Sequence, residues 1–365
     1  MGAPFHAWRE YFDKHQIKYF SSNYTLYGDM SHRVMTLLQM LCADTEIYSI
    51  DEAFLNLETM AIADYAQYAE HVRNTIKTCT SIPVSVGIGP SKTLAKIANK
   101  IAKKQKGVCN LMDVTLREKI LQDFPVQDIW GVGRRLSERL IAMNIHTARE
   151  LRDADLKHVR ASFSVVMEKT VRELRGIACL PLEIFQPKKE IMSSRSFGSP
   201  VSQLIELEEA VSHYAGKACV KLRKQQSVAA GVYVFLQTNP YKIHTKQYAN
   251  SASTLLVAAT DHTGLITTAA LKCLRRIYKK GYLYKKAGIM LLDLSPASTR
   301  QADLFYTPNN KQDLLMQMLD AVNSKFGKRS LYMASEGTSM TWRMRCDNRS
   351  PNYTTSWQNL ARVRG

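Results

Sequence analysis

The order of helical and extended patterns between residues 31 and 104 is the feature that most constrains the fold. Helical spacing of apolar residues, short strand patterns and a basic helical pattern follow one another over 31–41, 46–50, 53–57, 65–77, 83–89 and 92–104. The first five, in the order helix, strand, strand, helix and strand, correspond to a ferredoxin-like βαββαβ unit without its first strand, and the basic helix follows them. We therefore expect an incomplete sheet in which the neighbours of that central strand keep unpaired backbone.

The rest of the chain divides into three further regions. Residues 116–178 show short helical patterns around Gly131-Val-Gly133, a helix-hairpin-helix signature, and 181–190 are rich in Pro and Lys and indicate a linker. Strand and helix patterns over 191–298 predict a separate α+β domain. A polar stretch and a helical pattern over 313–326 follow, so the sequence predicts an α+β multidomain protein with a short C-terminal extension.

Length, charge and cysteines narrow the class of protein. The 365 residues exceed what one core usually supports, and a net charge of +18 indicates a polyanionic partner, nucleic acid above all. A merely basic protein or a membrane-surface binder is the alternative, but the basic residues lie in several separate blocks. Seven scattered cysteines without a C-x-x-C pair fit a reducing, cytoplasmic location. No apolar run is long enough to span a membrane, so no membrane partner is expected.

Asp51 and Glu52 stand between the two short strand patterns. Mg²⁺ prefers carboxylate oxygens, and a turn that breaks the strand alternation would let both side chains reach one metal site. An acidic pair at a hairpin is more often solvated turn chemistry, which is the alternative. The pair is a candidate catalytic and metal-binding site.

Two basic segments are candidate phosphate contacts. The first carries six lysines and no acid over 91–107, directly after a glycine-rich strand end, and suggests DNA contacts by Ser91, Lys92 and Lys96. A solvated helix face is the alternative, although unrelieved like charge on one helix is unfavourable. In the second, Gly131 and Gly133 would let backbone N–H groups approach a phosphate beside Arg134, unless the glycines only cap a helix.

A short peptide follows the last folded domain. Gln301, Asp303, Leu304 and Phe305 lie in a polar stretch with no core of its own for the Leu-Phe pair. Two apolar anchors in such a place suggest a segment that docks on another protein.

Taken together, these residues resemble one family. The segments 21–31, 46–54, 87–96, 128–135 and 170–176 look like those of Y-family translesion DNA polymerases of the UmuC type, the subunit of bacterial DNA polymerase V, and the similarity runs almost from end to end. The resemblance implies a remnant of the fingers (1–25), a palm (26–113), a thumb (114–180), a linker (181–190), a little finger (191–298), and a clamp-binding peptide with a C-terminal segment (299–365).

The resemblance also implies an activity, a cofactor and partners. The activity is error-prone translesion DNA synthesis in SOS repair, with two Mg²⁺ ions, primer-template DNA and deoxynucleoside triphosphates. Asp51 and Glu52 match the second and third metal carboxylates, Lys103 matches the lysine that holds the triphosphate, and Arg195 matches a residue along the DNA. Residues 301–305 match the sliding-clamp peptide, and a UmuD-like dimer and the RecA filament are implied as further partners.

One departure qualifies this picture. The family begins with a strand that carries Asp-x-Asn and the first metal carboxylate, whereas Met1-Gly-Ala-Pro resembles a site inside the fingers, and no other Asp here matches. Loss of one carboxylate would remove most of the charge stabilisation in a two-metal site. Three hypotheses stay open: a polymerase whose coding sequence starts upstream, a catalytically dead DNA and clamp binder, and an unstable fragment.

Overall fold

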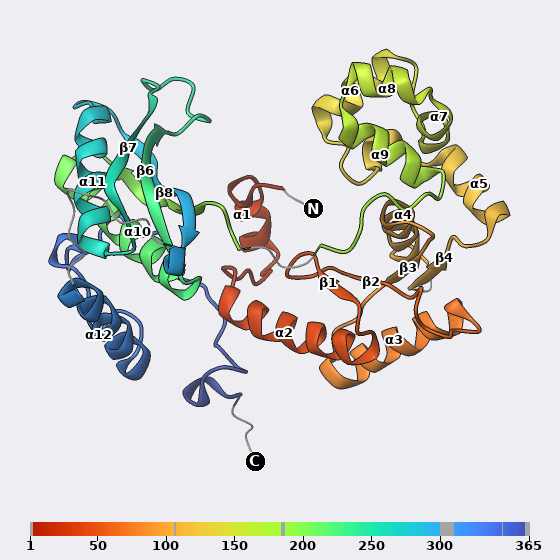
Figure 1. Cartoon of the computed structure of the whole chain (residues 1–365), viewed down its shortest axis with the longest axis horizontal. Coiled ribbons are helices and arrows are strands. Elements are labelled where there is room, and N and C mark those ends of the chain that lie inside the picture. The colour runs from red at the N-terminus through yellow and green to blue at the C-terminus, as the bar shows by residue number, and fades with distance from the viewer. Residues whose placement is uncertain (1–2, 106, 184–186, 300–309, 345, 362–365) are drawn as a thin grey trace. The chain divides into compact units, whose positions relative to one another are not determined.

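The computed structural model describes residues 3–105, 107–183, 187–299, 310–344 and 346–361. The chain forms two compact units (Figure 1). The first comprises Met1–Phe185 with Asn348–Gly365, and the second comprises Gln186–Asp347. No helix among the described residues is both long enough and apolar enough to cross a lipid bilayer.

The first unit begins with the predicted succession of helices and short strands. The elements are α1 (Phe5–Lys14), α2 (Tyr24–Leu41), β1 (Thr45–Ile47), β2 (Ala53–Leu55), α3 (Tyr65–Thr80), β3 (Val86–Ile88), α4 (Lys92–Ala102) and β4 (Val108–Asn110). Strands β1 and β2 pair antiparallel, and β3 and β4 pair parallel. Among the described residues the two pairs form separate sheets, so β2 and β3 each keep one edge without a ladder partner, as expected for an incomplete ferredoxin-like sheet.

The glycines at the end of β3 serve helix packing. A Cβ atom on Gly87 would lie 2.0 Å from the backbone nitrogen of Asn99, and one on Gly89 would lie 2.9 Å from that of Ala95. Only glycine therefore lets α4 lie this close to the strand. The glycine-rich strand end noted in the sequence therefore serves the packing of the strand against its own following helix.

The predicted short helices of the thumb share one core with α4. They are α5 (Val114–Asp123), α6 (Arg134–Ala142), α7 (Ala148–Asp153), α8 (Leu156–Ser162) and α9 (Val165–Leu174). Leu94 of α4 is fully buried in the same cluster as Leu121, Leu140 and Leu174. Because they share apolar packing, α4 and the helix-hairpin-helix segment are held together as one body.

The second unit is a four-stranded antiparallel sheet with two helices on one face. Its elements are β5 (Ile191–Val201), α10 (Leu204–Lys224), β6 (Ser227–Thr238), β7 (Ala249–Thr260), α11 (Thr263–Ile277) and β8 (Tyr284–Pro296). The strand order is β5-β8-β6-β7. Alternate residues of the strands, such as Val232 and Ile289, are fully buried against the helices. The predicted α+β domain is confirmed.

Residues 310–344 complete this second unit, although the sequence placed 299–365 apart from it. Helix α12 (Asn310–Phe326) buries Met316, and Asp320 accepts two hydrogen bonds from Arg223 of α10, at 2.6 and 2.8 Å. Further on, a carboxylate oxygen of Glu336 lies 2.8 Å from Nδ1 of His213, and these two buried side chains share a hydrogen bond. The segment covers α10, and Met316 and Trp342 are buried there.

The chain then returns to the first unit. The backbone N–H of Ser21 donates to the carbonyl of Asn348 at 2.8 Å, and the amide Nδ2 of the fully buried Asn23 donates to the carbonyl of Ser350 at 2.9 Å. The Oδ1 atom of Asn23 also caps α2 through the N–H of Leu26. The chain thus passes between the units twice, once after 185 and once after 347.

Candidate active site

The acidic pair lies in the tight turn that joins β1 to β2. The N–H groups of Tyr48 and Ser49 both donate to the carbonyl of Glu52, at 3.1 and 3.0 Å. Asp51 is exposed, and its Oδ1 accepts a hydrogen bond from the Ser49 hydroxyl at 2.7 Å. The turn breaks the strand alternation, as the metal-site hypothesis requires.

The donor set fits Mg²⁺ in chemical type. Asp51 and Glu52 offer oxygen ligands, but the described residues contain no group of three or more acidic, His or Cys side chains that could hold a metal. Glu52 Oε1 lies 2.7 Å from Lys96 Nζ, and both side chains are partly exposed. A bound cation would therefore share Glu52 with Lys96 or displace it.

Each of three lysines on α4 has a carboxylate partner from a distant segment. Lys92 pairs with the buried Glu46, Lys96 with Glu52, and Lys100 with Asp128. The segment 91–107 contains no acid, so these carboxylate partners could not be predicted from it. Lys103, at the end of α4, is exposed and has no ion pair within the described ranges, which leaves its ammonium group available to an anion.

Ser91 and Lys92 are held inside the first unit. Ser91 is buried and caps α4, and its hydroxyl donates to the carbonyl of Glu173 at 2.7 Å. Lys92 Nζ also donates to the carbonyl of Pro181 at 2.8 Å. Direct contacts of Ser91, Lys92 and Lys96 with DNA stay predictions, because all three side chains have partners within the chain.

Glu173 is a positioning residue that the sequence analysis did not single out. Its fully buried carboxylate accepts hydrogen bonds from the N–H groups of Thr93, Cys179 and Leu180, at 3.0, 2.6 and 3.2 Å. The group therefore joins the start of α4 to the end of the thumb. Its signal in the sequence is its place within the family-like segment 170–176.

The helix-hairpin-helix loop leaves space at its glycines. Gly131 has a φ of +86°, a value that favours glycine, and a Cβ on Gly131 or Gly133 would meet nothing within 4 Å. Gly133 begins α6 without a side-chain cap, so the first N–H groups of the helix have no such acceptor. Arg134 follows with a side chain 89% exposed. This arrangement can accept a phosphate.

Three aromatic rings connect the carboxylate turn to this loop. Tyr48 and Phe54 of the hairpin both lie against Trp130, with ring centroids 5.5 and 5.6 Å away. The indole N–H of Trp130 donates to the Tyr48 hydroxyl at 3.2 Å. This contact joins residues 82 positions apart and was not predicted from the sequence.

Arg195 lies on β5 of the second unit. Arg195 lies directly opposite the buried Ala287 of β8, and residues opposite each other in an antiparallel pair point to the same face of the sheet. The Arg195 side chain therefore leaves the sheet on the face that α10 covers. Burial, with the positive charge of Arg195 as the next cause, lowers the pKa of Lys217. No ion pair of Arg195 occurs within the described part of the chain, and its place along DNA stays a prediction. Gln301, Asp303, Leu304 and Phe305 lie outside the described residues.

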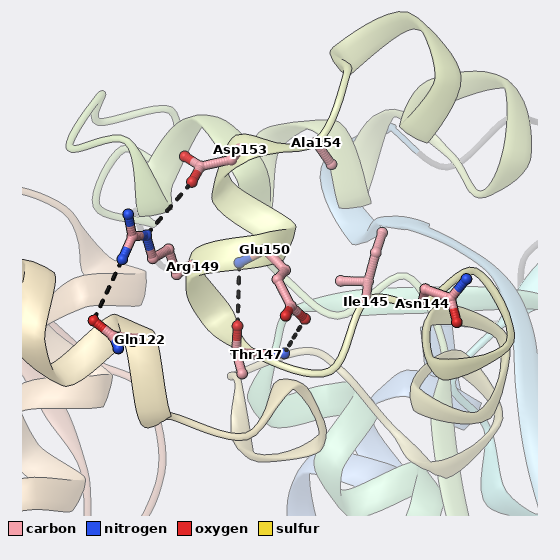
Figure 2. A pocket seen from close by; sticks show the side chains of 8 residues that line it. All are labelled: Gln122, Asn144, Ile145, Thr147, Arg149, Glu150, Asp153 and Ala154. Atoms are coloured by element: carbon pink, nitrogen blue, oxygen red, sulfur yellow. Dashed lines mark hydrogen bonds and ion pairs between the residues drawn. The ribbon is translucent and has the colours of Figure 1, made fainter.

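A hollow of about 610 Å³ on the thumb contains none of these candidates (Figure 2). Its polar side chains mostly bond one another: Arg149 bonds Gln122 at 3.3 Å and pairs with Asp153, and Glu150 forms a capping box with Thr147. The hollow is therefore formed by the helix ends of the thumb, and its side chains bind one another.

Comparison with known proteins decides the family. Models of the impB/mucB/samB family match residues 1–100 for its main region, 117–145 for its helix-hairpin-helix motif and 188–304 for its C-terminal domain. The protein UmuC of Salmonella typhimurium strain LT2 is 42% identical over all of this chain and 88% of its own length. The chain belongs to this family. Residues 313–363 match a further domain of unknown function.

Other relatives fit the same assignment. Protein MucB of Salmonella typhimurium is 39% identical over 99% of this chain and 87% of its own, and DNA polymerase IV of Desulfatibacillum aliphaticivorans is 25% identical over 82% and 75%. A Y-family DNA polymerase chimera of known structure has a TM-score of 0.60 at 18% identity, over 75% of this chain and 78% of its own. The fold class is confirmed, and the chain is by family a UmuC-like, DNA-directed DNA polymerase of translesion synthesis.

Proposed function

We propose that this UmuC-like chain contributes to template-directed addition of deoxynucleotides to a primer, opposite damaged bases, by two-metal phosphoryl transfer. The observation that carries the proposal is the turn that holds Asp51 and Glu52 at the edge of the palm, in the same unit as Lys103 and the Gly131–Gly133 loop. Such a site needs metal-binding oxygens, a cation for the triphosphate and a grip on the DNA backbone, and this unit offers all three.

Each group has a distinct role in this proposal. Asp51 and Glu52 would hold Mg²⁺, which supplies charge stabilisation to the transferring phosphoryl group when bound. Lys103, free of an ion pair in the described residues, binds the triphosphate through its ammonium group. The uncapped N–H groups at the start of α6 and the exposed Arg134 bind backbone phosphates of the duplex without reading its sequence.

The proposed partners follow from the family and from charge. A net charge of +18 suits primer-template DNA, and a solved relative with a TM-score of 0.51 is titled as an insertion ternary complex. Deoxynucleoside triphosphates, a sliding clamp bound through 301–305, a UmuD-like dimer and the RecA filament complete the set, in the cytoplasm during the SOS response. Clamp binding rests on Gln301, Asp303, Leu304 and Phe305.

A second function remains in competition: binding of DNA and clamp without polymerisation. It is favoured by two observations on the described residues, the lack of a third acidic group beside Asp51 and Glu52 and the separation of the palm sheet into two pairs. A two-metal reaction depends on full metal coordination, so an incomplete set would lower the rate far more than the affinity for DNA.

Primer extension tests the two functions against each other. The purified 365-residue chain is assayed with Mg²⁺ and primer-template DNA, with and without the clamp, beside an Asp51→Ala variant and a salt titration of DNA binding. Extension that Asp51→Ala abolishes supports polymerisation. Salt-sensitive binding without extension supports the second function, and absence of both contradicts the proposal.

A further inference from the structure

The contact between Tyr48 and Trp130 joins the two ends of the proposed reaction centre. The indole N–H donates to the phenol oxygen at 3.2 Å, and the rings meet edge to face at an interplanar angle of 84°. Phe54, which is 9% exposed, lies under both rings at 5.7 Å from Tyr48 and 5.6 Å from Trp130. Tyr48 and Trp130 therefore meet in a defined geometry, and both rings pack on the buried ring of Phe54.

On one side, the contact adjoins the carboxylate turn. The backbone N–H of Tyr48 donates to the carbonyl of Glu52, so a shift of Tyr48 changes the closure of the turn. Lys96 adds a second connection, because its Nζ lies 5.6 Å from the centre of the Tyr48 ring and 2.7 Å from Glu52 Oε1.

On the other side, the contact adjoins the phosphate-accepting loop. Trp130 directly precedes Gly131, and its neighbours Ile129 and Val132 are buried in the thumb core. The loop is thus held in the thumb core on both sides of Gly131, and the indole ring of Trp130 extends from the loop to the β1–β2 hairpin. A phosphate bound at the start of α6 acts on backbone that begins at Gly133 and Arg134, three and four residues after Trp130.

The exposure of Tyr48 indicates that its contact with Trp130 does more than fill the core. Tyr48 is 46% exposed, so its ring fills little of the core, and an exposed hydrogen bond contributes modestly to stability. We propose that Trp130 and Tyr48 are positioning residues through which binding of the DNA backbone at the Gly131–Gly133 loop orders the Asp51–Glu52 turn. This inference rests on the proposed function, because it requires that the loop bind DNA.

Hydrogen exchange of the turn, measured by mass spectrometry on the full chain, tests the coupling without relying on catalysis. In the native sequence, saturating primer-template DNA is expected to slow exchange in a peptide that covers 45–55 by about fivefold, the equivalent of one hydrogen bond gained. In Trp130→Leu this effect of DNA is lost, while the dissociation constant for DNA changes by no more than about fivefold, the size of the coupling itself. Trp130→Phe, which keeps the ring, retains part of the effect.

Trp357→Leu is the matched control, because this tryptophan of the same unit is 90% exposed and touches none of these rings. The control keeps the full effect of DNA. If Trp130→Leu does not fold, Tyr48→Leu replaces it. Equal protection of the turn by DNA in the native chain and in the variant overturns the inference, as does DNA binding without any protection. A native chain that does not bind DNA at all overturns the proposed function as well.

Discussion

Replacement of Trp342 by alanine is the sharpest test of the claim that residues 310–344 belong to the core of the second unit. Trp342 is 3% exposed, and its ring lies 5.5 Å from His213, 5.7 Å from Tyr214 and 6.4 Å from Phe197. Truncation of a buried tryptophan typically costs about 3–5 kcal/mol. Its indole N–H has no hydrogen-bond partner among the described residues, so loss of the polar group offsets part of the cost and we expect about 3 kcal/mol.

Native-state hydrogen exchange of α10 is the suitable assay, since a chain of two units need not unfold in one step. A loss of about 3 kcal/mol speeds exchange of the slowest α10 amides by about 100-fold. Trp357→Ala removes the same side chain from a site that is 90% exposed and shifts stability by less than about 0.5 kcal/mol. Equal exchange rates in the two variants would refute the burial argument, because only one of them leaves a cavity.

The remaining predictions concern three other polar side chains. Burial lowers the pKa of His213 below 6.5 despite its carboxylate partner, so below that pH the unfolded chain binds a proton that the folded chain does not. Stability of the second unit should therefore fall as pH drops from 6.5 toward the folded pKa, and His213→Gln should flatten that dependence in urea unfolding. Asn23→Ala removes hydrogen bonds to 350 and 351 and should expose the C-terminal segment to protease, at a cost of about 1–3 kcal/mol. Arg223→Ala removes a guanidinium that is 9% exposed and bonds both Asp320 and the carbonyl of Asp261, and it should cost about 3–5 kcal/mol, whereas Arg275→Ala, at a side chain 60% exposed, should cost less than about 1 kcal/mol in the same unfolding assay.

Helices and strands could be predicted from local sequence patterns wherever one face of the element is apolar. The helix expected over 92–104 is observed as Lys92–Ala102, and that expected over 65–77 as Tyr65–Thr80. Helix α2 starts at Tyr24, seven residues before the predicted start, because Asn23 caps it while Tyr24 is 75% exposed and adds no apolar period. Strand β4 was not predicted from the sequence, because it is defined by its long-range parallel pairing with β3.

The candidate site was predictable only where its residues are neighbours in sequence. Asp51 and Glu52 adjoin two strand patterns, so their turn could be expected. The partner of Lys100 is Asp128, and the ring against Tyr48 is that of Trp130. Such pairs depend on the tertiary packing of α4 against the thumb, and no spacing rule along one chain reports them.

The chain passes twice between its two units, and this determines how one unit can be exchanged for that of a related protein. The second unit comprises Gln186–Asp347, and the residues after it are anchored at Ser21 and Asn23 of the first. A chimera joined once in the linker would replace these terminal residues too and separate Asn23 from its own partners. A transplant that keeps both bodies intact needs two junctions, one on each side of an internal cassette.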